Sequence, residues 1–227
     1  RSFTYWRSTS AAREFFALDA AEETLFRLAG EGYFYFSGIS LSILDEDART
    51  RLMSVADRAS NDGVSVVFDG NYRANLWDAW DSDPQAILTE LVSEATILIG
   101  NHRDISLLLG QTFSGDGPAR RREAAEAAFA AFPKLELIAS TARHVDSATA
   151  QRLAGRVDLR ASHWQTDEIR IDPVVDRIGT GDAYAAGVIL RWLEGGSAQD
   201  MAKSGLALAA MKHGIAGDSI SVTRAEL

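Results

Sequence analysis

Short apolar runs alternate with helical segments along the chain, and this alternation is the feature that most constrains the fold. Runs rich in β-branched or aromatic side chains have the length of buried strands and lie at residues 33–37, 64–69, 96–100 and 135–140. Periodic apolar positions and start or stop signals predict helices at residues 19–30, 45–61, 118–132, 182–195 and 198–213. Strands that alternate with helices form βαβ units and a mainly parallel sheet. The sequence therefore predicts an α/β fold.

Other elements are predicted from local signals. Asp19 and Glu22 have the spacing of a capping box for the first of these helices. Asp83–Pro84 begins a further helix, in the favoured order of cap and proline, and a short helix follows Asn101. We expect irregular loop and short hairpin strands between Arg143 and Ile171, and a last strand that ends at residues 174–176.

Polar residues follow several strand candidates directly. They lie at Asp69–Arg73, Asn101–Asp104 and Asp176–Asp182. In open α/β sheets, ligands bind beyond the carboxyl ends of the strands. We therefore expect the functional residues in these segments.

Charge and composition exclude several classes of function. A net charge of −9 argues against a general nucleic-acid binder, because phosphate backbones require a basic surface. The chain has no cysteine, which excludes disulfides and thiolate metal sites and is compatible with a reducing cytoplasm. No apolar run reaches the roughly 18 residues of a membrane helix. The 4 histidines lack metal-site spacing, and we interpret His213 as a surface residue at a helix end, with an adenine neighbour as the alternative.

The segment Asp176-Arg-Ile-Gly-Thr-Gly-Asp182 is the strongest motif. Gly179 and Gly181 leave room for backbone N–H groups to approach a ligand, and the positive end of the following helix suits a phosphate. A carboxylate at this place is explained if Asp182 accepts a proton from a hydroxyl that attacks phosphorus. The alternative is a glycine turn in which the aspartate only caps a helix. The segment is neither a Walker A loop nor a GxGxxG dinucleotide motif.

This motif resembles the signature D-[TR]-x-G-[AT]-G-D of the ribokinase-like (phosphofructokinase B) carbohydrate kinases, and it matches every constrained position. The resemblance implies a three-layer α/β/α kinase domain over residues 1–227, with ATP and Mg²⁺ as cofactors. It assigns Asp182 as the catalytic base and Gly179, Thr180 and Gly181 as the anion hole for the ATP phosphates. It also implies an upstream segment with lid strands, which form homodimers in the family, and we expect this segment to precede Arg1.

Asn101-His-Arg-Asp104 is similar to the family's N-x-x-E segment, which helps to place Mg²⁺ through waters. Magnesium prefers oxygen ligands and retains several waters, so a carboxylate suits this role. Aspartate here replaces the family's glutamate and has a shorter side chain. The alternative is a helix N-cap formed by Asn101 and an acid at Asp104 that favours the helix dipole.

Two segments resemble the 2-keto-3-deoxygluconate kinase branch of the family: residues 2–13 and residues 68–77. The resemblance implies that Arg7 and Arg73 bind the carboxylate of a sugar acid, with Tyr5 and Asn71 nearby. A guanidinium binds a planar carboxylate bidentately, which makes this assignment chemically sensible. Asp218 and Asp182 complete the implied substrate site. Read without the family, Arg7 and Arg73 are ordinary surface residues.

The expected activity is phosphorylation of 2-keto-3-deoxygluconate to its 6-phosphate by ATP. The alternatives are a kinase for a neutral sugar or a nucleoside, of the fructokinase or ribokinase type, and a non-catalytic sugar-binding relative. Ser140 lies where the family has a glycine-punctuated loop beside the nucleotide, so we assign it to nucleotide binding, although no glycine follows until Gly155. The expected partners are a small sugar acid and ATP, with neither a nucleic acid nor a membrane.

Overall fold

The computed structural model describes residues 10–30, 32–77 and 83–227. The chain forms two compact units. One combines Arg1–Phe113 with Ala127–Glu136, and the other combines Ser114–Glu126 with Leu137–Leu227. The single kinase domain stays a prediction. Among the described residues, no helix is both long enough and apolar enough to cross a membrane.

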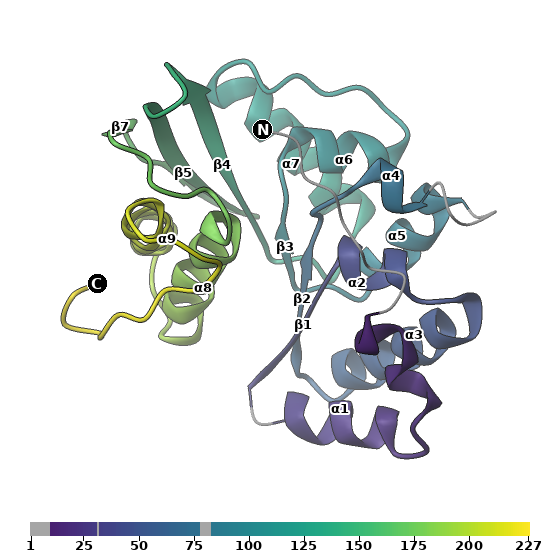
Figure 1. The fold of residues 1–227 in the computed structure, drawn as a ribbon. Coiled ribbons are helices and arrows are strands. Elements are labelled where there is room, and N and C mark those ends of the chain that lie inside the picture. The colour runs from purple at the N-terminus through teal and green to yellow at the C-terminus, as the bar shows by residue number, and fades with distance from the viewer. Residues whose placement is uncertain (1–9, 31, 78–82) are drawn as a thin grey trace. The chain divides into compact units, whose positions relative to one another are not determined.

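A parallel sheet lies at the centre of the first unit (Figure 1). Strands β1 (Tyr33–Ser37), β2 (Ser65–Asp69) and β3 (Ile97–Ile99) confirm the predicted runs. Tyr33 is the register partner of Ser65, and Val67 that of Ile97. The side chains of β2 and β3 are almost all buried, as expected where helices cover a parallel sheet.

Helices alternate with the strands along the chain, and most of the predicted helices keep their predicted boundaries. The helices are η1 (Ala11–Ala17), α1 (Ala21–Ala29), α2 (Gly38–Ile43), α3 (Glu46–Asn61), α4 (Ala74–Trp77), α5 (Pro84–Val92), α6 (His102–Leu109) and α7 (Gly117–Ala131), the last of which is divided between the two units. Helix α3 shows why the boundaries were predictable. Asp45 caps it by accepting the N–H of Ala48 at 2.9 Å, and apolar residues at helical spacing from Leu52 to Ala59 are buried on one face.

The capping box predicted at Asp19 and Glu22 is wrong. Helix α1 begins after Ala20, which makes no side-chain cap. Glu22 instead forms an ion pair with Arg51 of α3, and the Arg51 guanidinium also donates to the carbonyl of Phe16. The hydrogen bond from Arg51 lowers the pKa of Glu22 to about 2. The carboxylate therefore joins two helices, which the spacing along one helix could not reveal.

The second unit contains antiparallel strands. These are β4 (Leu137–Val145), β5 (Gln151–Leu159), β6 (His163–Gln165) and β7 (Ile169–Ile171), and β5 pairs with each of the others. The expectation of irregular loop and short hairpin strands between Arg143 and Ile171 is confirmed for the short strands β6 and β7, but the expected irregular loop is wrong where β4 extends to Val145 and where the long strand β5 lies. The sequence did not predict β5 because this strand contains charged residues. Arg156 and Asp158 are buried in it as a bidentate ion pair with N–O distances of 2.6 and 2.8 Å.

Residues 174–176 also differ from the prediction, because they form a loop without strand structure. The N–H of Val174 donates to the carbonyl of Thr149, and those of Val175 and Asp176 both donate to the carbonyl of His213. This loop is therefore attached to the end of a helix rather than to a neighbouring strand.

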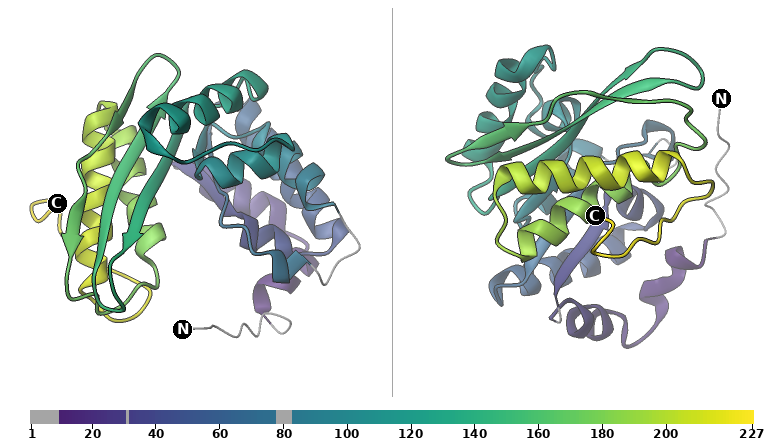
Figure 2. Two further views of the ribbon diagram at one scale, coloured as in Figure 1. Left: turned by 90° about the horizontal axis from the view of Figure 1, so that it is seen from above. Right: turned by 90° about the vertical axis from the view of Figure 1, so that its left-hand side faces the viewer.

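Helices α8 (Thr180–Leu193) and α9 (Ala198–His213) lie side by side, and α9 packs on β5 (Figure 2). Their close approach depends on glycine. A Cβ atom on Gly187 would lie 2.6 Å from the carbonyl oxygen of Ser204, and one on Gly205 would lie 2.8 Å from the ring of Tyr184. These distances are shorter than van der Waals contact, so the packing of the pair requires both glycines.

The variant Gly187→Ala tests this packing. The added methyl group meets the backbone of α9, and overpacking of this kind costs about 1–3 kcal/mol of stability, against a gain of up to about 1 kcal/mol in helix propensity. We expect a lower melting temperature by differential scanning calorimetry.

Gly181→Ala is the matched control, because a Cβ at this other glycine of α8 meets no atom of the described chain within 4 Å. Its melting temperature should be unchanged or slightly raised. Equal losses in both variants would contradict the packing argument.

Candidate active site

Asp176 organises the loop that precedes α8. One carboxylate oxygen accepts the N–H groups of Arg177 and Ile178 at 2.7 and 3.2 Å, and the other accepts the N–H of Gly217 at 3.1 Å. These backbone hydrogen bonds, first that of Ile178 and then that of Gly217, lower the pKa of Asp176. Asp176 therefore remains ionised and joins the loop before α8 to the loop after α9. The sequence motif contains this residue but did not reveal its role.

Gly179 allows the chain to enter α8. Its φ of 72° lies in the left-handed region, and a Cβ atom there would collide with the carbonyl group of Asp218. The hydroxyl of Thr180 donates to the carbonyl of Arg177 at 3.0 Å, so this side chain also supports the turn. Gly179 and Thr180 thus shape the loop, and their backbone is what remains available to a ligand.

Gly181 and Asp182 form the open part of the same site. Both residues are exposed, and the space beside the α-carbon of Gly181 is empty of described atoms to 4 Å. No side chain caps the amino terminus of α8, whose first N–H groups have no acceptor within the helix. Within the described part of the chain, the Asp182 carboxylate has neither a hydrogen bond nor an ion pair. An uncapped positive helix end beside a carboxylate without a partner can bind an anion and accept a proton.

His213 is bonded to the loop that precedes α8, and its interpretation as a surface residue is wrong. Its side chain is only 2% exposed, and burial lowers its pKa. The neutral ring donates from Nδ1 to the carbonyl of Ala209 at 2.6 Å and accepts the amide N–H of Gln151 at Nε2, at 2.5 Å. Its own carbonyl receives the N–H groups of Val175 and Asp176. The residue therefore fixes the loop through its main chain.

Lys212 contributes a second support. Its side chain is fully buried, and the ammonium group donates to the carbonyl of Ile215 at 2.8 Å. Its charge is also close enough to lower the pKa of Asp176. Asp218 itself is exposed, and its contact with the site in this structure is made by its backbone against Gly179. The predicted residues Gly179, Thr180, Gly181, Asp182 and Asp218 are thus brought together in the second unit.

In the first unit, Asn101 and Asp104 form a helix cap. The side chain of Asn101 accepts the N–H of Arg103 at 2.8 Å, and Oδ2 of Asp104 accepts the N–H of Asn101 at 2.8 Å. This is the helix N-cap that the sequence left open as the alternative to a magnesium-placing segment. Oδ1 of Asp104 has no hydrogen bond to the described residues other than its own backbone, so one carboxylate oxygen remains available.

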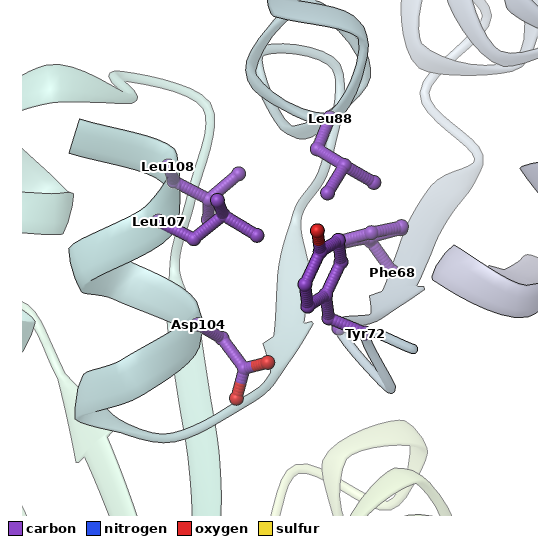
Figure 3. A pocket seen from close by; sticks show the side chains of 7 residues that line it. Phe68, Tyr72, Leu88, Asp104, Leu107 and Leu108 are labelled. Carbon is purple, nitrogen blue, oxygen red and sulfur yellow. The ribbon is translucent and has the colours of Figure 1, made fainter. Parts of the chain in front are cut away.

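Asp104 is also tightly enclosed. Burial raises its pKa, while the backbone N–H of Asn101 and the charges of His102 and Arg73 act in the opposite direction. Figure 3 shows its carboxylate on the same side of α6 as Leu107 and Leu108, facing Tyr72 across a small cavity. The cavity measures about 10 Å³, on the order of one water molecule, and is too small for a sugar.

The segment after β2 carries the predicted substrate residues Asn71 and Arg73. Asn71 has a φ of 30°, an uncommon conformation for a residue other than glycine. Arg73 is exposed and close enough to Asp104 to influence its pKa. The segment is anchored by Trp77, whose buried ring lies 5.0 Å from the guanidinium carbon of Arg49. Arg49 on α3 was not among the predicted site residues.

The remaining predicted residues are less informative. Ser140 lies half-buried in β4 opposite Arg156 of β5. Tyr5 and Arg7 lie outside the described residues. A direct metal site is not formed by the described chain, because it contains no group of three or more acidic, histidine or cysteine side chains that could hold an ion. Oδ1 of Asp104 fits a contact to a water of Mg²⁺, since this ion retains several of its waters.

Comparison with known proteins finds relatives that carry the same name. The chain is 31% identical over 205 residues to the 2-dehydro-3-deoxygluconokinase of Dickeya dadantii and 31% identical over 206 residues to that of Escherichia coli, and each match covers 90% of this chain. The chain spans 61% and 62% of the lengths of these two relatives.

Solved structures confirm the fold class. The 2-dehydro-3-deoxygluconokinase of Thermotoga maritima superposes with a TM-score of 0.77 at 29% identity, over 86% of this chain and 58% of that protein. The ribokinase-like α/β prediction is thus confirmed. The family model described as pfkB family carbohydrate kinase matches residues 1–224. Together with the glycine loop before α8, this match shows that the chain belongs to the pfkB family of carbohydrate kinases.

Proposed function

We propose that the protein transfers the γ-phosphoryl group of ATP to the 6-hydroxyl of 2-keto-3-deoxygluconate. The observation that carries this proposal is the arrangement at the start of α8, where an exposed Asp182 without a described partner follows an uncapped, glycine-lined turn. The named relatives, which are 2-dehydro-3-deoxygluconokinases at about 31% identity, support the same substrate.

In the proposed reaction, Asp182 accepts the proton of the sugar hydroxyl as its oxygen attacks the γ-phosphorus. The bond from this phosphorus to the bridging oxygen of ADP breaks, and the proton stays on the carboxylate until it is released. The backbone N–H groups of the anion hole, at Gly179, Thr180 and Gly181, are assigned to stabilise the negative charge on the transferred group. Asp182 is exposed in this structure, so its carboxylate is accessible to a substrate hydroxyl.

Mg²⁺ bound with ATP would neutralise charge on the phosphates, and we assign Oδ1 of Asp104 to bind a water of that ion. Oδ2 is already used in the cap of α6. The role of Asp104 is therefore to present one oxygen from a fixed side chain. Asn101 acts in this proposal by holding the same helix end.

Recognition of the acid is assigned to Arg73, together with Arg7. The guanidinium of Arg73 is exposed and has no hydrogen bond or ion pair to the described residues, so it can bind a planar carboxylate bidentately. Asn71 and Tyr5 are assigned to the same end of the sugar, and Asp218 to its hydroxyl groups. Ser140 is assigned to the nucleotide. A homodimer in the cytoplasm remains part of the proposal that rests on the family resemblance.

The variant Asp182→Asn tests the base. The amide keeps the size of the side chain but does not accept the proton, so turnover should fall about 10²–10⁴-fold, the usual contribution of general-base catalysis. A coupled ADP-release assay with 2-keto-3-deoxygluconate measures this loss, and the affinity for ATP should change little. Asp218→Asn is the comparison, because it alters an exposed acid that is assigned to the hydroxyl groups of the sugar, so it should raise the KM for the sugar acid without removing the base. Near-wild-type turnover of Asp182→Asn would refute the mechanism.

The variant Gly181→Val tests the anion hole. The φ angle of Gly181 is not positive, and no described atom lies within 4 Å of the position of an added Cβ. The valine variant should therefore fold normally. The branched side chain occupies the space that the phosphates require, so the KM for ATP should rise by roughly 10-fold or more, by analogy with the loss of one charged hydrogen bond.

Ala186→Val is the matched control, because Ala186 is exposed on the same helix. It introduces the same side chain one turn further along and should leave the KM for ATP unchanged. If both variants behave alike in the ATP titration, the loop has only a structural role.

The variant Arg73→Ala tests the substrate class. Loss of a charge-assisted hydrogen bond of about 1.5–3 kcal/mol corresponds to a rise of roughly 10–150-fold in the KM for the sugar acid. Arg73→Lys should restore this affinity only in part, because an ammonium group lacks the planar pair of donors. The constants for ATP should be little changed, and the preference for the acid over its neutral sugar analogue should largely disappear.

Arg58→Ala is the control, since Arg58 is an exposed arginine of the same unit that pairs with Glu23 on the surface. Its kinetic constants should match those of the wild type. A well-folded Arg73→Ala protein that still prefers the acid would exclude the sugar-acid assignment and favour a neutral-sugar kinase.

A further inference from the structure

Tyr184 lies two residues after Asp182 on α8, but its side chain is buried. It is only 1% exposed, and its ring is enclosed between β5 and α9. A Cβ atom on Gly155 would lie 3.0 Å from this ring, and one on Gly205 would lie 2.8 Å from it. The two glycines therefore form a slot that fits an aromatic ring at this position.

The hydroxyl group of Tyr184 makes two hydrogen bonds to one residue of β5. It accepts the N–H of Arg156 at 3.1 Å and donates to the carbonyl of Arg156 at 2.8 Å. Arg156 is the register partner of Ser140 in β4, and the backbone of Ser140 also interacts with the phenol. Burial raises the pKa of Tyr184, so the phenol keeps the proton that it donates.

Arg156 is itself rigidly held. Its guanidinium forms the bidentate pair with Asp158, and the two side chains are only 2% and 4% exposed. Arg122 of α7 donates to Asp158 at 3.2 Å and to the carbonyl of Leu159 at 2.8 Å. The phenol is therefore bonded to one of the most constrained points of the second unit.

We propose that Tyr184 is a positioning residue for catalysis, which fixes the first turn of α8 so that Asp182 is held at the attacking hydroxyl. This inference rests on the proposed function of Asp182. A phenylalanine would fill the same slot, but only the hydroxyl has the directional bonds that resist rotation or sliding of the helix. Asp182 has no side-chain contact to hold it among the described residues, so its position is set by the helix that carries it.

The variant Tyr184→Phe removes the hydroxyl and keeps the ring. We expect kcat for the sugar acid to fall roughly 10-fold or more, since small displacements of reacting groups have effects up to about 10²-fold. The KM values for both substrates should remain within about twofold, since neither binding surface is altered. The ratio of ADP released to sugar phosphorylated should rise, because a displaced base favours water over the sugar.

Val188→Ala is the matched control. Val188 is fully buried on the same helix, and its truncation creates a cavity while the phenol and its two hydrogen bonds to Arg156 are retained. It should lower the melting temperature while kcat and the coupling ratio stay at wild-type values. If Tyr184→Phe retains wild-type kcat, or if both variants lose kcat to the same extent, the positioning role is refuted.

A second measurement covers the case in which Tyr184→Phe is destabilised. The kcat per folded molecule, determined below the melting transition of the variant, should still fall at unchanged KM, and an unchanged kcat would again refute the inference. The two proposals fail in different ways. A wild-type chain that does not phosphorylate sugar acids contradicts the proposed function, whereas an active wild type with an equally active Tyr184→Phe contradicts only the positioning role.

Discussion

The contact between Gly179 and the carbonyl of Asp218 is the constraint on which the rest of the site depends. It requires a left-handed residue without a side chain at the start of α8, and it brings the loop after α9 against the loop before α8. Asp176 reinforces this contact by accepting N–H groups from both loops. Gly181 and Asp182 can be exposed and unoccupied by other side chains because Gly179, Thr180 and Asp176 already hold the turn.

Much of the fold could be predicted because it is encoded in local patterns. The β-branched runs of β2 and β3 and the capped, amphipathic α3 were recognised because each signal lies within a few residues. The errors have two physical causes, which are pairing between residues far apart in sequence and the burial of charged residues within a strand. Glu22 bonds to Arg51 rather than to its own helix, and the long strand β5 conceals a buried ion pair that reads as a polar loop.

The same distinction applies to the site. Asp182 and the glycine loop were found because the motif is contiguous, and family resemblance gave them roles. His213, Lys212 and Gln151 were missed because a histidine, a lysine and a glutamine near element ends are usually exposed, whereas here all three are buried and bonded. Lys212 donates to the carbonyl of Ile215 in the following loop, His213 donates to the carbonyl of Ala209 within α9, and Gln151 donates to the ring of His213. No sequence pattern specifies these partners. A buried donor or acceptor that lacks a partner costs about 1–3 kcal/mol, which explains why the ammonium group of Lys212 and both ring nitrogens of His213 are bonded.

Asp104 shows how one carboxylate can serve both of the roles that the sequence left open. Its Oδ2 completes the cap of α6, whereas its Oδ1 bonds to no other described residue, so the cap does not exclude a water-mediated ion contact. The short side chain of aspartate favours the combination, because it is held close to the backbone at Gly70 and Gly100, where any Cβ atom would collide with it or press tightly against it. The absence of side chains at Gly70 and Gly100 therefore makes room for the side chain of Asp104. A longer acid at 104 would need space that these two backbone segments already occupy, so the aspartate and its two glycines constrain one another.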